Sequence, residues 1–478
     1  MAKFIGRKRE LAKLCTLLDK KSPALIVVKG RRRIGKSRLL SEFGKMVGRV
    51  HIFTGLAPDK GVTAKDQRLE FARQLSHEFG LRGLKTDDWG DLLWQLAAQV
   101  KTGRVLVVLD EISWMGHDEP TFLSKLKIAW EMYFKENPNL ILALCSSISM
   151  WIDKNLLSST GFVGRQSLVL TLKELSLPEC GEFWRDQEKL ASPLEKLITL
   201  AVTGGIPRYL EEINPNLPAE QNIKNLCFSP EGILFREFDQ IFSDLFSDKK
   251  ILYSEICACL ALGPADAKSI YQHIGLSGNG DDYAHLENLV LSGFIAKDYS
   301  WHLKNGKMAK IAWYRLSDNY CRFYLKYILP NKHRIEADDY HDITLTALPS
   351  WSTILGLQIE NCVLNNRKLI HDALGISQQD IIAHNPYRQR ATKSQSGCQI
   401  DYLIQTRFNT LYVCEIKYSK DAIQKTVIDE VQQKIKALAV TRNFSIRPVL
   451  IHCNSVSEAI EESGFFAKII DFSQFLSA

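Results

Sequence analysis

One loop constrains this chain more than any other segment: Gly30–Ser37, with the sequence GRRRIGKS. It fits the pattern G-x-x-x-x-G-K-[ST], in which a glycine-rich turn points backbone N–H groups at phosphate oxygens. The apolar run Ala24–Lys29 precedes the loop, and a helical pattern at Arg38–Met46 follows it. A buried strand that leads through such a loop into a helix is the framework of a three-layer α/β nucleotide-binding domain. The sequence therefore predicts a phosphate-binding P-loop.

The P-loop predicts both a nucleotide and a metal ion. We expect Lys36 to reach the β and γ oxygens of ATP and the Ser37 hydroxyl to ligate Mg²⁺. Residues 1–50 carry 15 Lys or Arg against three acidic residues, a balance that suits a polyphosphate and also a nucleic-acid backbone. Outside the loop, a solvated lysine-rich surface explains this charge as well. The residues expected to contact ATP are Gly30, Arg31, Arg32, Arg33, Ile34, Gly35, Lys36, Ser37 and Arg38.

An acidic pair, Asp110 and Glu111, follows a second buried strand at Val105–Leu109. Parallel strands deliver such residues to the sheet edge where the phosphates lie. We expect Asp110 to hold Mg²⁺ through water and Glu111 to polarise the attacking water. The structural alternative is a helix N-cap. Further strands are predicted at Val50–Thr54 and Leu140–Cys145, and a helix at Gln67–Phe79.

Polar residues after the strand at 140–145 extend the predicted site. Ser146, which we expect to be catalytic, and its neighbour Ser147 could position the water or sense the γ-phosphate. Arg165, in the segment GFVGR, could neutralise transition-state charge within one subunit or across a subunit contact. The second arrangement would require a homo-oligomer. A surface salt bridge is the alternative role for Arg165.

Two smaller modules are expected after the ATPase core, which we place at residues 1–170. The pattern of residues 171–246 predicts a helical lid, and that of residues 247–320 a winged helix-turn-helix. A basic turn at Lys304–Lys310 favours DNA contact, but a protein-packing spacer is an equal alternative. The expected helices are Ile251–Leu262, Ala267–Ile274 and Tyr283–Ser292, and the expected strands are Phe294–Lys297 and Ile311–Leu316.

The last domain, residues 321–478, carries a second set of charged residues on predicted strands. Strand periodicity puts Glu415 and Lys417 on the same face, and Asp401 can approach them from an antiparallel neighbour. Two acids and a lysine at a sheet edge predict a Mg²⁺ site with a charge that orients water or stabilises a pentavalent phosphate. An exposed charged strand pair is the alternative, but the apolar flanks make unpaired charge costly there.

Glu360 lies on a helix predicted at Ile354–Leu364 and is expected to complete the metal shell. Together, these patterns predict an α/β multidomain chain. The other elements expected in its last domain are strands at Gln399–Gln405, Leu411–Tyr418 and Pro448–His452, a helix at Ile423–Ala439 and a tail helix that ends near Leu476.

Several motifs together resemble the archaeal-type ATPase family, which comprises P-loop ATPases of the AAA+/STAND kind. The similarity covers about residues 3–240. It rests on FIGR at 4–7, GRRRIGKS at 30–37, LDEI at 109–112, CSSISM at 145–150 and GGIPRYL at 204–210. The resemblance implies that Pro207 packs against the adenine and that the stretch from Phe4 to Arg7 flanks the base from the other side.

The C-terminal set resembles the PD-(D/E)XK nuclease superfamily: Asp401, then Glu415-x-Lys417, with Glu360 on the preceding helix. Ile400 stands where that superfamily places a proline. Archaeal-type ATPases often carry such a domain. The resemblance implies a restriction-endonuclease-like α/β fold and Mg²⁺-dependent cleavage of DNA.

Composition indicates where such a chain works. The apolar run Leu140–Leu144 is too short to span a bilayer, and we expect no membrane partner. The 11 cysteines contain no C-x-x-C pair. An odd number of cysteines without a signal peptide points to the reducing cytoplasm.

Three functions remain open from the sequence. The preferred hypothesis is an ATP-hydrolysing enzyme that regulates a nuclease acting on DNA. The second is a DNA-binding or remodelling ATPase whose nuclease-like module is catalytically silent. The third is a switch whose nucleotide state controls oligomerisation.

Overall fold

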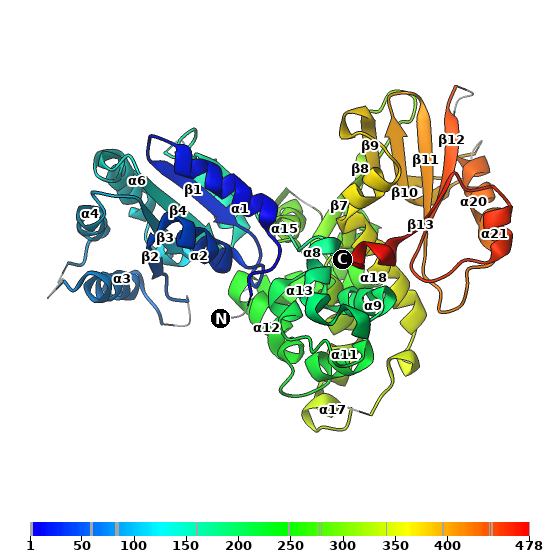
Figure 1. The fold of residues 1–478 in the computed structure, drawn as a ribbon, viewed down its shortest axis with the longest axis horizontal. Helices are drawn as coiled ribbons and strands as arrows, with labels where there is room; N and C mark the ends of the chain where they lie inside the picture. Colours follow the sequence, from blue (N-terminus) through cyan, green and yellow to red (C-terminus); the bar gives the residue numbers. More distant parts are fainter. Residues whose placement is uncertain are drawn as a thin grey trace. The chain divides into compact units, whose positions relative to one another are not determined.

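The computed structural model describes most of the chain, which forms two compact units (Figure 1). The first unit comprises Met1–Leu175 with the short segments Gln240–Asp248 and Leu291–Gly293; the second comprises Ser176–Asp239, Lys249–Val290 and Phe294–Ala478. Most of the residues predicted to form the lid, the winged helix and the C-terminal domain belong to the second unit. The described residues are 3–57, 61–81, 86–158, 161–246, 249–276, 278, 280–340, 342–393, 396–438, 440 and 443–477.

The first unit is built on a parallel sheet with the strand order β2-β3-β4-β1-β5. β1, β3 and β4 are buried along their whole length, as their continuous apolar sequences predict. The prediction of a parallel α/β sheet is confirmed. The strands are β1 (Ala24–Lys29), β2 (Arg49–Thr54), β3 (Val105–Asp110), β4 (Leu140–Ser146) and β5 (Leu168–Thr171).

Aromatic side chains close the core on one side of this sheet. Trp89 packs edge-to-face against Phe71 and Phe122, with ring centroids 5.0 and 4.7 Å apart. The unit's helices are α1 (Lys8–Cys15), η1 (Thr16–Asp19), α2 (Lys36–Val47), α3 (Ala64–Phe79), α4 (Trp89–Gln99), α5 (Ile112–Met115), α6 (Phe122–Met132), η2 (Phe134–Glu136), α7 (Ser149–Ile152) and η3 (Asp153–Leu157).

The second unit begins with helices, as predicted from the loss of β-branched runs. Capping is clear at α8, where Ser176 and Glu179 form a reciprocal capping box. The helices are α8 (Leu177–Gly181), η4 (Glu182–Leu190), α9 (Pro193–Thr203), α10 (Pro207–Leu210), α11 (Ala219–Cys227) and α12 (Ile233–Phe246), whose residues from Gln240 onward belong to the first unit.

Residues 250–316 form three helices and a small antiparallel sheet with the order β6-β8-β7. The two-stranded hairpin of the prediction gains a third strand, β6, which pairs with β8 at Ala265 and Tyr314. The elements are α13 (Lys250–Ala261), β6 (Ala265–Asp266), α14 (Ala267–Ile274), α15 (Gly280–Leu291), β7 (Ile295–Trp301) and β8 (Met308–Leu316).

A helical connection leads from β8 to the C-terminal sheet. Its longest helix, α18, buries Trp351, Ile354, Leu355 and Ile359. The segments are α16 (Asn319–Phe323), η6 (Tyr324–Ile328), η7 (Leu329–Asn331), α17 (Lys332–Glu336), η8 (Leu345–Ala347), α18 (Trp351–Asn365), α19 (Arg367–Ala373) and η9 (Gln378–Asp380).

The C-terminal sheet is mixed, with the order β13-β12-β11-β10-β9 (yellow to red in Figure 1). β10 pairs antiparallel with both β9 and β11, and β12 pairs parallel with both β11 and β13. Helix α20 covers one face. The elements are β9 (Ile381–Gln389), β10 (Cys398–Thr406), β11 (Thr410–Lys417), α20 (Thr426–Ala437), β12 (Ser445–His452), α21 (Glu458–Glu462), β13 (Lys468–Asp471) and η10 (Phe472–Leu476).

The tail of the chain corrects one prediction. A single helix ending near Leu476 was expected, but the tail contains α21, β13 and η10. β13 is only four residues long and forms because Ile469 and Ile470 pair with Leu450 and Ile451 of β12. A segment this short has no clear period of its own, so its partner strand decides its conformation.

The small sheet at 265–316 is joined to the C-terminal sheet through β7. The Trp301 indole Nε1–H donates to Gln405 Oε1 at 2.5 Å, and Gln405 Nε2 donates to Leu303 O at 2.9 Å. Ser300 Oγ both donates to Arg388 O and accepts from Arg388 N, each at 2.9 Å. Trp301 belongs to the same hydrophobic core as Ile400 and Val431. The two sheets therefore share one core.

Charged side chains reinforce this joint. The buried Asp298 of β7 accepts from Arg315 Nε of β8 at 2.8 Å and from Arg367 Nη2 of α19 at 3.2 Å. Two guanidinium groups on one buried carboxylate satisfy the requirement that buried charge be paired. Within the described residues, no helix is long and apolar enough to cross a membrane.

Replacing Trp301 with Phe should loosen the joint between β7 and β10. The substitution leaves Gln405 Oε1 buried without its donor, which costs about 1–3 kcal/mol. We expect faster amide hydrogen exchange in peptides that cover residues 295–301 and 398–406. Trp94→Phe is the matched control, because Trp94 is 49% exposed. Equal exchange in both variants would show that the indole hydrogen bond does not hold the two sheets together.

Candidate functional site

The P-loop has the backbone that a phosphate cradle requires. It runs from the end of β1 at Lys29 to the start of α2 at Lys36. Gly30 has φ 151° and Gly35 has φ 88°, a range that side chains disfavour. A Cβ on Gly30 would lie 2.6 Å from Leu172 O, so both its conformation and its space require glycine.

The predicted phosphate and metal ligands meet at this loop. Lys36 Nζ donates to Gly30 O at 2.9 Å and to Arg31 O at 3.2 Å. Ser37 Oγ donates to Asp110 Oδ2 at 2.6 Å. The sheet order places β3, which carries Asp110, two strands from β1 in space, with only β4 between them. The structure therefore brings Ser37 and Asp110 together as a pair of oxygen ligands that suits Mg²⁺.

Glu111 is held in a conformation that is rare for a residue with a side chain. Its φ is 49°, which costs about 1–3 kcal/mol and persists where the surroundings fix it. The Glu111 carboxylate accepts from Ser147 N at 2.9 Å and from Ser147 Oγ at 2.8 Å. This geometry fixes the carboxylate next to the Ser37–Asp110 pair.

Of the two serines at the end of β4, Ser147 contacts Glu111 and Ser146 does not. Ser146 is fully buried, and its Oγ lies 2.8 Å from Ser113 Oγ and accepts from Ile148 N at 3.1 Å. Strand alternation explains the difference, because successive side chains point to opposite faces. Ser146 thus supports the strand end, and Ser147 orients Glu111.

An N-terminal residue, Arg7, forms a hydrogen bond with the P-loop backbone. Arg7 is buried, and its Nη2 donates to Ile34 O at 2.9 Å and to Lys173 O at 2.6 Å. Phe4 is half-buried. Arg38 Nη2 donates to Lys3 O at 2.9 Å. Arg7 therefore contacts the peptide backbone of the P-loop itself.

The other residues predicted to contact ATP lie in different environments. Ile34 and Arg31 are buried, Arg33 has φ 69°, and Arg32 forms an ion pair with Asp244. Pro207 is the first residue of α10, in the second unit.

Arg165 has an acidic partner in its own domain. Its Nε lies 2.6 Å from Glu131 Oε1, and Lys135 Nζ lies 2.6 Å from the other oxygen. Hydrogen bonds from Lys135 and Arg165 lower the pKa of Glu131. This is the salt bridge that the sequence left open as the alternative role for Arg165.

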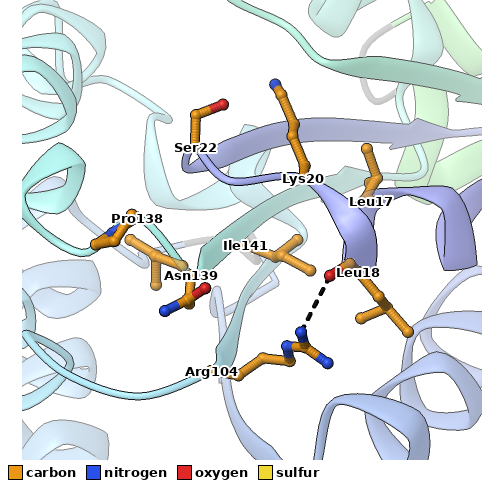
Figure 2. A pocket seen from close by; sticks show the side chains of 9 residues that line it. Leu17, Leu18, Lys20, Ser22, Arg104, Pro138, Asn139 and Ile141 are labelled. Carbon is orange, nitrogen blue, oxygen red and sulfur yellow. Dashed lines mark hydrogen bonds between the residues drawn. The ribbon is translucent and has the colours of Figure 1, made fainter.

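A small pocket lies at the other edge of the same sheet (Figure 2). Its lining includes Ser22, just before β1, Leu140 and Ile141 at the start of β4, and Arg104, which donates to Leu18 O at 3.0 Å. Parallel α/β sheets bind ligands at the carboxyl ends of their strands. This pocket lies at the amino ends and is separate from the nucleotide site.

The C-terminal charged residues meet where two strands separate. The antiparallel pairing between β10 and β11 ends at the pair Tyr402 and Cys414. Beyond that point, the Asp401 carboxylate takes the next backbone donor, accepting from Ile416 N at 2.9 Å through Oδ2. A bulge between Ile400 and Leu403 shifts the pairing with β9, and bulges commonly re-aim a side chain.

Glu415 and Lys417 share one face of β11, as predicted. Lys417 Nζ lies 3.3 Å from Glu415 Oε1 and 2.7 Å from Glu430 Oε2 on α20. Glu415 is 2% exposed. Asp401, Glu415 and Lys417 therefore come together as the sequence predicted.

A second lysine, which the sequence analysis did not single out, sits between the two acids. Lys434 Nζ lies 2.5 Å from Glu415 Oε2 and 3.5 Å from Asp401 Oδ1. Lys434 lies one turn after Glu430 on α20. That i, i+4 spacing was visible in the sequence, but it is common on exposed helix faces, so it gave no sign of a site.

Burial and like charge dominate the electrostatics of this site. Burial and the neighbouring Asp401 raise the pKa of Glu415, and Lys434 and Lys417 oppose that rise. Burial lowers the pKa of Lys434, but Asp401 and Glu415 more than offset this, so it lies above its ordinary value. Burial, with Asp401 nearby, raises the pKa of Glu360 to about 7.

The oxygens present fit Mg²⁺ only as a two-carboxylate site. Within the described ranges, no three His, Cys, Asp or Glu side chains form a group that could hold a metal ion. The structure therefore does not support a three-carboxylate shell that includes Glu360. Mg²⁺ commonly uses one or two carboxylates and completes its octahedron with water and substrate phosphate. Asp401 Oδ1 and Glu415 Oε2, which face the same ammonium, meet that requirement.

Comparison with known proteins adds a family match. Residues 4–213 match the model of a family described as an ATPase domain predominantly from Archaea. An uncharacterized protein of Methanocaldococcus jannaschii is 27% identical over 334 residues, covering 70% of each chain. A Walker-type ATPase of Pyrococcus abyssi aligns with 18% identity and a TM-score of 0.44, over 67% of this chain and 96% of that chain. The ORC2 protein of Aeropyrum pernix aligns with 16% identity and a TM-score of 0.41, over 71% and 97%.

Replacing Lys434 with Met should destabilise the fold in a pH-dependent way. Glu415 then keeps only Lys417 as a counter-ion, and we expect a loss of about 1–3 kcal/mol in the free energy of unfolding. The variant raises the folded pKa of Glu415 further above its ordinary value of 4.5. The unfolded chain releases that proton at lower pH, so the loss is absent below about pH 4 and grows as pH rises.

Urea denaturation of the parent and variant between pH 4 and pH 8 measures this difference. Lys436→Met on the exposed side of α20 is the control and should match the parent at each pH. A pH-independent loss in Lys434→Met would mean that packing of the lysine stem, and not its charge, stabilises the site.

Proposed function

We propose that this chain, whose residues 4–213 match the model of an ATPase family predominantly from Archaea, is an ATP-hydrolysing enzyme that regulates a Mg²⁺-dependent nuclease acting on DNA. The observation that carries the nuclease part is the convergence of Asp401 Oδ1 and Glu415 Oε2 on one cation, with Lys417 beside them. The proposal rests on that geometry and on the sequence resemblance to the PD-(D/E)XK superfamily.

The nucleotide half works through residues already in place. Backbone N–H groups of the P-loop cradle the phosphates, and Lys36 exchanges its contacts with loop carbonyls for phosphate oxygens. Ser37 and Asp110 would hold Mg²⁺, which when bound would supply positive charge against the phosphates. Glu111 accepts a proton from the attacking water, and Ser147 keeps that carboxylate oriented. Pro207 and Phe4 remain proposed contacts of the adenine.

The C-terminal half would cleave a phosphodiester bond. Asp401 and Glu415 would hold Mg²⁺, which when bound polarises the phosphate and lowers the pKa of water. Lys417 orients the attacking water or donates to a phosphate oxygen, and its contact with Glu430 holds the ammonium at the site. Glu360, with its pKa raised to about 7, is available to hold a proton near Asp401.

DNA is the proposed polymer because of the basic hairpin in the second unit. Lys304 and Lys307 lie in the turn between β7 and β8, Lys310 lies on β8, and all three are exposed. Exposed lysines on a wing can neutralise backbone phosphates without reading sequence. The helices and strands of residues 250–316 support a winged-helix reading of this segment, which we propose as the DNA contact.

One observation favours a second candidate function. The Lys434 ammonium occupies the point on which the two acids converge. A lysine that stayed there permanently would replace the metal and leave a catalytically silent module. The chain would then be a DNA-binding or remodelling ATPase.

Substitutions in the P-loop test the ATPase half. Lys36→Ala should abolish ATP hydrolysis and weaken ATP binding, because the ammonium contacts the phosphates directly. Glu111→Gln should lower kcat at least 100-fold while ATP still binds, since only the proton acceptor is lost. A phosphate-release assay and a fluorescent ATP analogue measure the two effects. Hydrolysis at the parent rate in Glu111→Gln would exclude Glu111 as the base.

Incubation with plasmid and linear DNA tests the nuclease half. We expect cleavage that requires Mg²⁺ or Mn²⁺ and depends on added ATP. Glu415→Ala and Lys417→Ala should reduce it at least 100-fold, whereas Lys436→Ala should not. Cleavage that persists in Glu415→Ala would assign the activity to a contaminant. Salt-sensitive DNA binding without cleavage would favour the silent-module candidate.

A further inference from the structure

We propose that Lys434 is an exchangeable counter-ion: its ammonium occupies the cation position between Asp401 and Glu415, and a divalent metal ion binds by displacing it. This inference rests on the proposed metal-dependent function of the same site. It assigns a role to a residue that no sequence motif marks.

Each carboxylate is held by one oxygen and presents the other to the ammonium. Asp401 Oδ2 accepts from Ile416 N at 2.9 Å, which leaves Oδ1 facing Lys434 Nζ at 3.5 Å. Glu415 Oε1 faces Lys417 Nζ at 3.3 Å, which leaves Oε2 facing Lys434 Nζ at 2.5 Å. The two inner oxygens are therefore fixed around a single point. A Mg²⁺ ion there, with ligand oxygens at about 2.0–2.1 Å, would draw Asp401 Oδ1 inward from its 3.5 Å distance to the ammonium.

Like charge explains why a cation must occupy that point. Two carboxylates in a buried setting repel each other, and a positive charge between them offsets that repulsion. The Lys434 ammonium supplies such a charge, because it faces one oxygen of each acid. A divalent ion supplies twice the charge at shorter range, so it competes effectively for the same oxygens.

The side chain of Lys434 can leave. It is 26% exposed, whereas Glu415 is 2% exposed. A lysine has a flexible four-carbon stem and a strongly hydrated head group, so rotation about its χ angles returns the ammonium to water. Displacement places it at the rim of the site, where it can meet the phosphate of a bound nucleic acid.

Helix α20 controls both lysines of the site. Glu430 holds Lys417, while Lys434, one turn further along, holds the acids. Removing Lys434 from between the acids leaves the contact of Lys417 with Glu430 intact. Two residues of α20 therefore have separate contacts: Lys434 contacts the acids, and Glu430 contacts Lys417. Displacement of Lys434 by a metal ion leaves the position of Lys417 unchanged.

Metal binding to the full-length protein tests the proposal without any cleavage assay. Mn²⁺ titration, followed by calorimetry or by the loss of the free Mn²⁺ electron paramagnetic resonance signal, is run on the parent, Lys434→Met and Lys436→Met. The binding attributed to this site is the part that Glu415→Gln removes. We expect Lys434→Met to bind Mn²⁺ about tenfold more tightly, a size typical of residues that surround metal ligands. Lys436→Met should bind like the parent.

A second measurement needs no variant and remains decisive if Lys434→Met does not fold. Amine acetylation of the parent protein, read by peptide mass spectrometry, is compared with and without Mn²⁺. Displacement of the ammonium into water should raise the labelling rate of Lys434 at least threefold and leave that of Lys436 unchanged.

The outcomes separate this inference from the proposed function. Parent-like Mn²⁺ affinity in Lys434→Met, or labelling of Lys434 that does not respond to Mn²⁺ in a metal-binding parent, overturns the exchange. Binding by Lys434→Met but not by the parent supports competition by Lys434 and overturns the nuclease function. No binding by any variant overturns both.

Discussion

Two acids brought close together in a buried setting need a positive charge between them, and much of the second unit is arranged to provide it. Glu415 is almost completely buried, and Asp401 reaches it only because β10 and β11 separate beyond Tyr402 and Cys414. Lys434 and Lys417 balance the pair from a helix and from the same strand. These two cations oppose the rise in the pKa of Glu415 that burial and the neighbouring Asp401 cause.

The first unit also has to place charged groups close together, and there backbone geometry contributes more than side-chain ion pairs. The positive φ angles of the P-loop point N–H groups outward, and the sheet order brings β3 close enough for Asp110 to bond Ser37. Glu111 accepts an unfavourable backbone conformation so that its carboxylate reaches the same edge. This strain is confined to Glu111, and the two hydrogen bonds from Ser147 stabilise the position of the Glu111 carboxylate.

Sequence patterns were sufficient where local chemistry decides the structure. The P-loop, the buried strands β1, β3 and β4, and the α20–β12 region follow from period, length and turn residues, and residues 4–213 match the model of an ATPase family. Patterns failed where a partner decides. β9 and β13 are edge strands that depend on β10 and β12. Lys434 was missed because its spacing on a helix is ordinary and only the fold brings it to Asp401.

Sharing one core between the small sheet and the C-terminal sheet has a mechanical consequence. Trp301, Ser300 and Asp298 tie β7 to β9, β10 and α19, so hydrogen bonds connect the hairpin to the sheet that carries the acid pair. A duplex held on that hairpin would meet the acids at a fixed span. The connection between the two sheets would then set a constant number of base pairs between the strand break and the duplex contact on the hairpin.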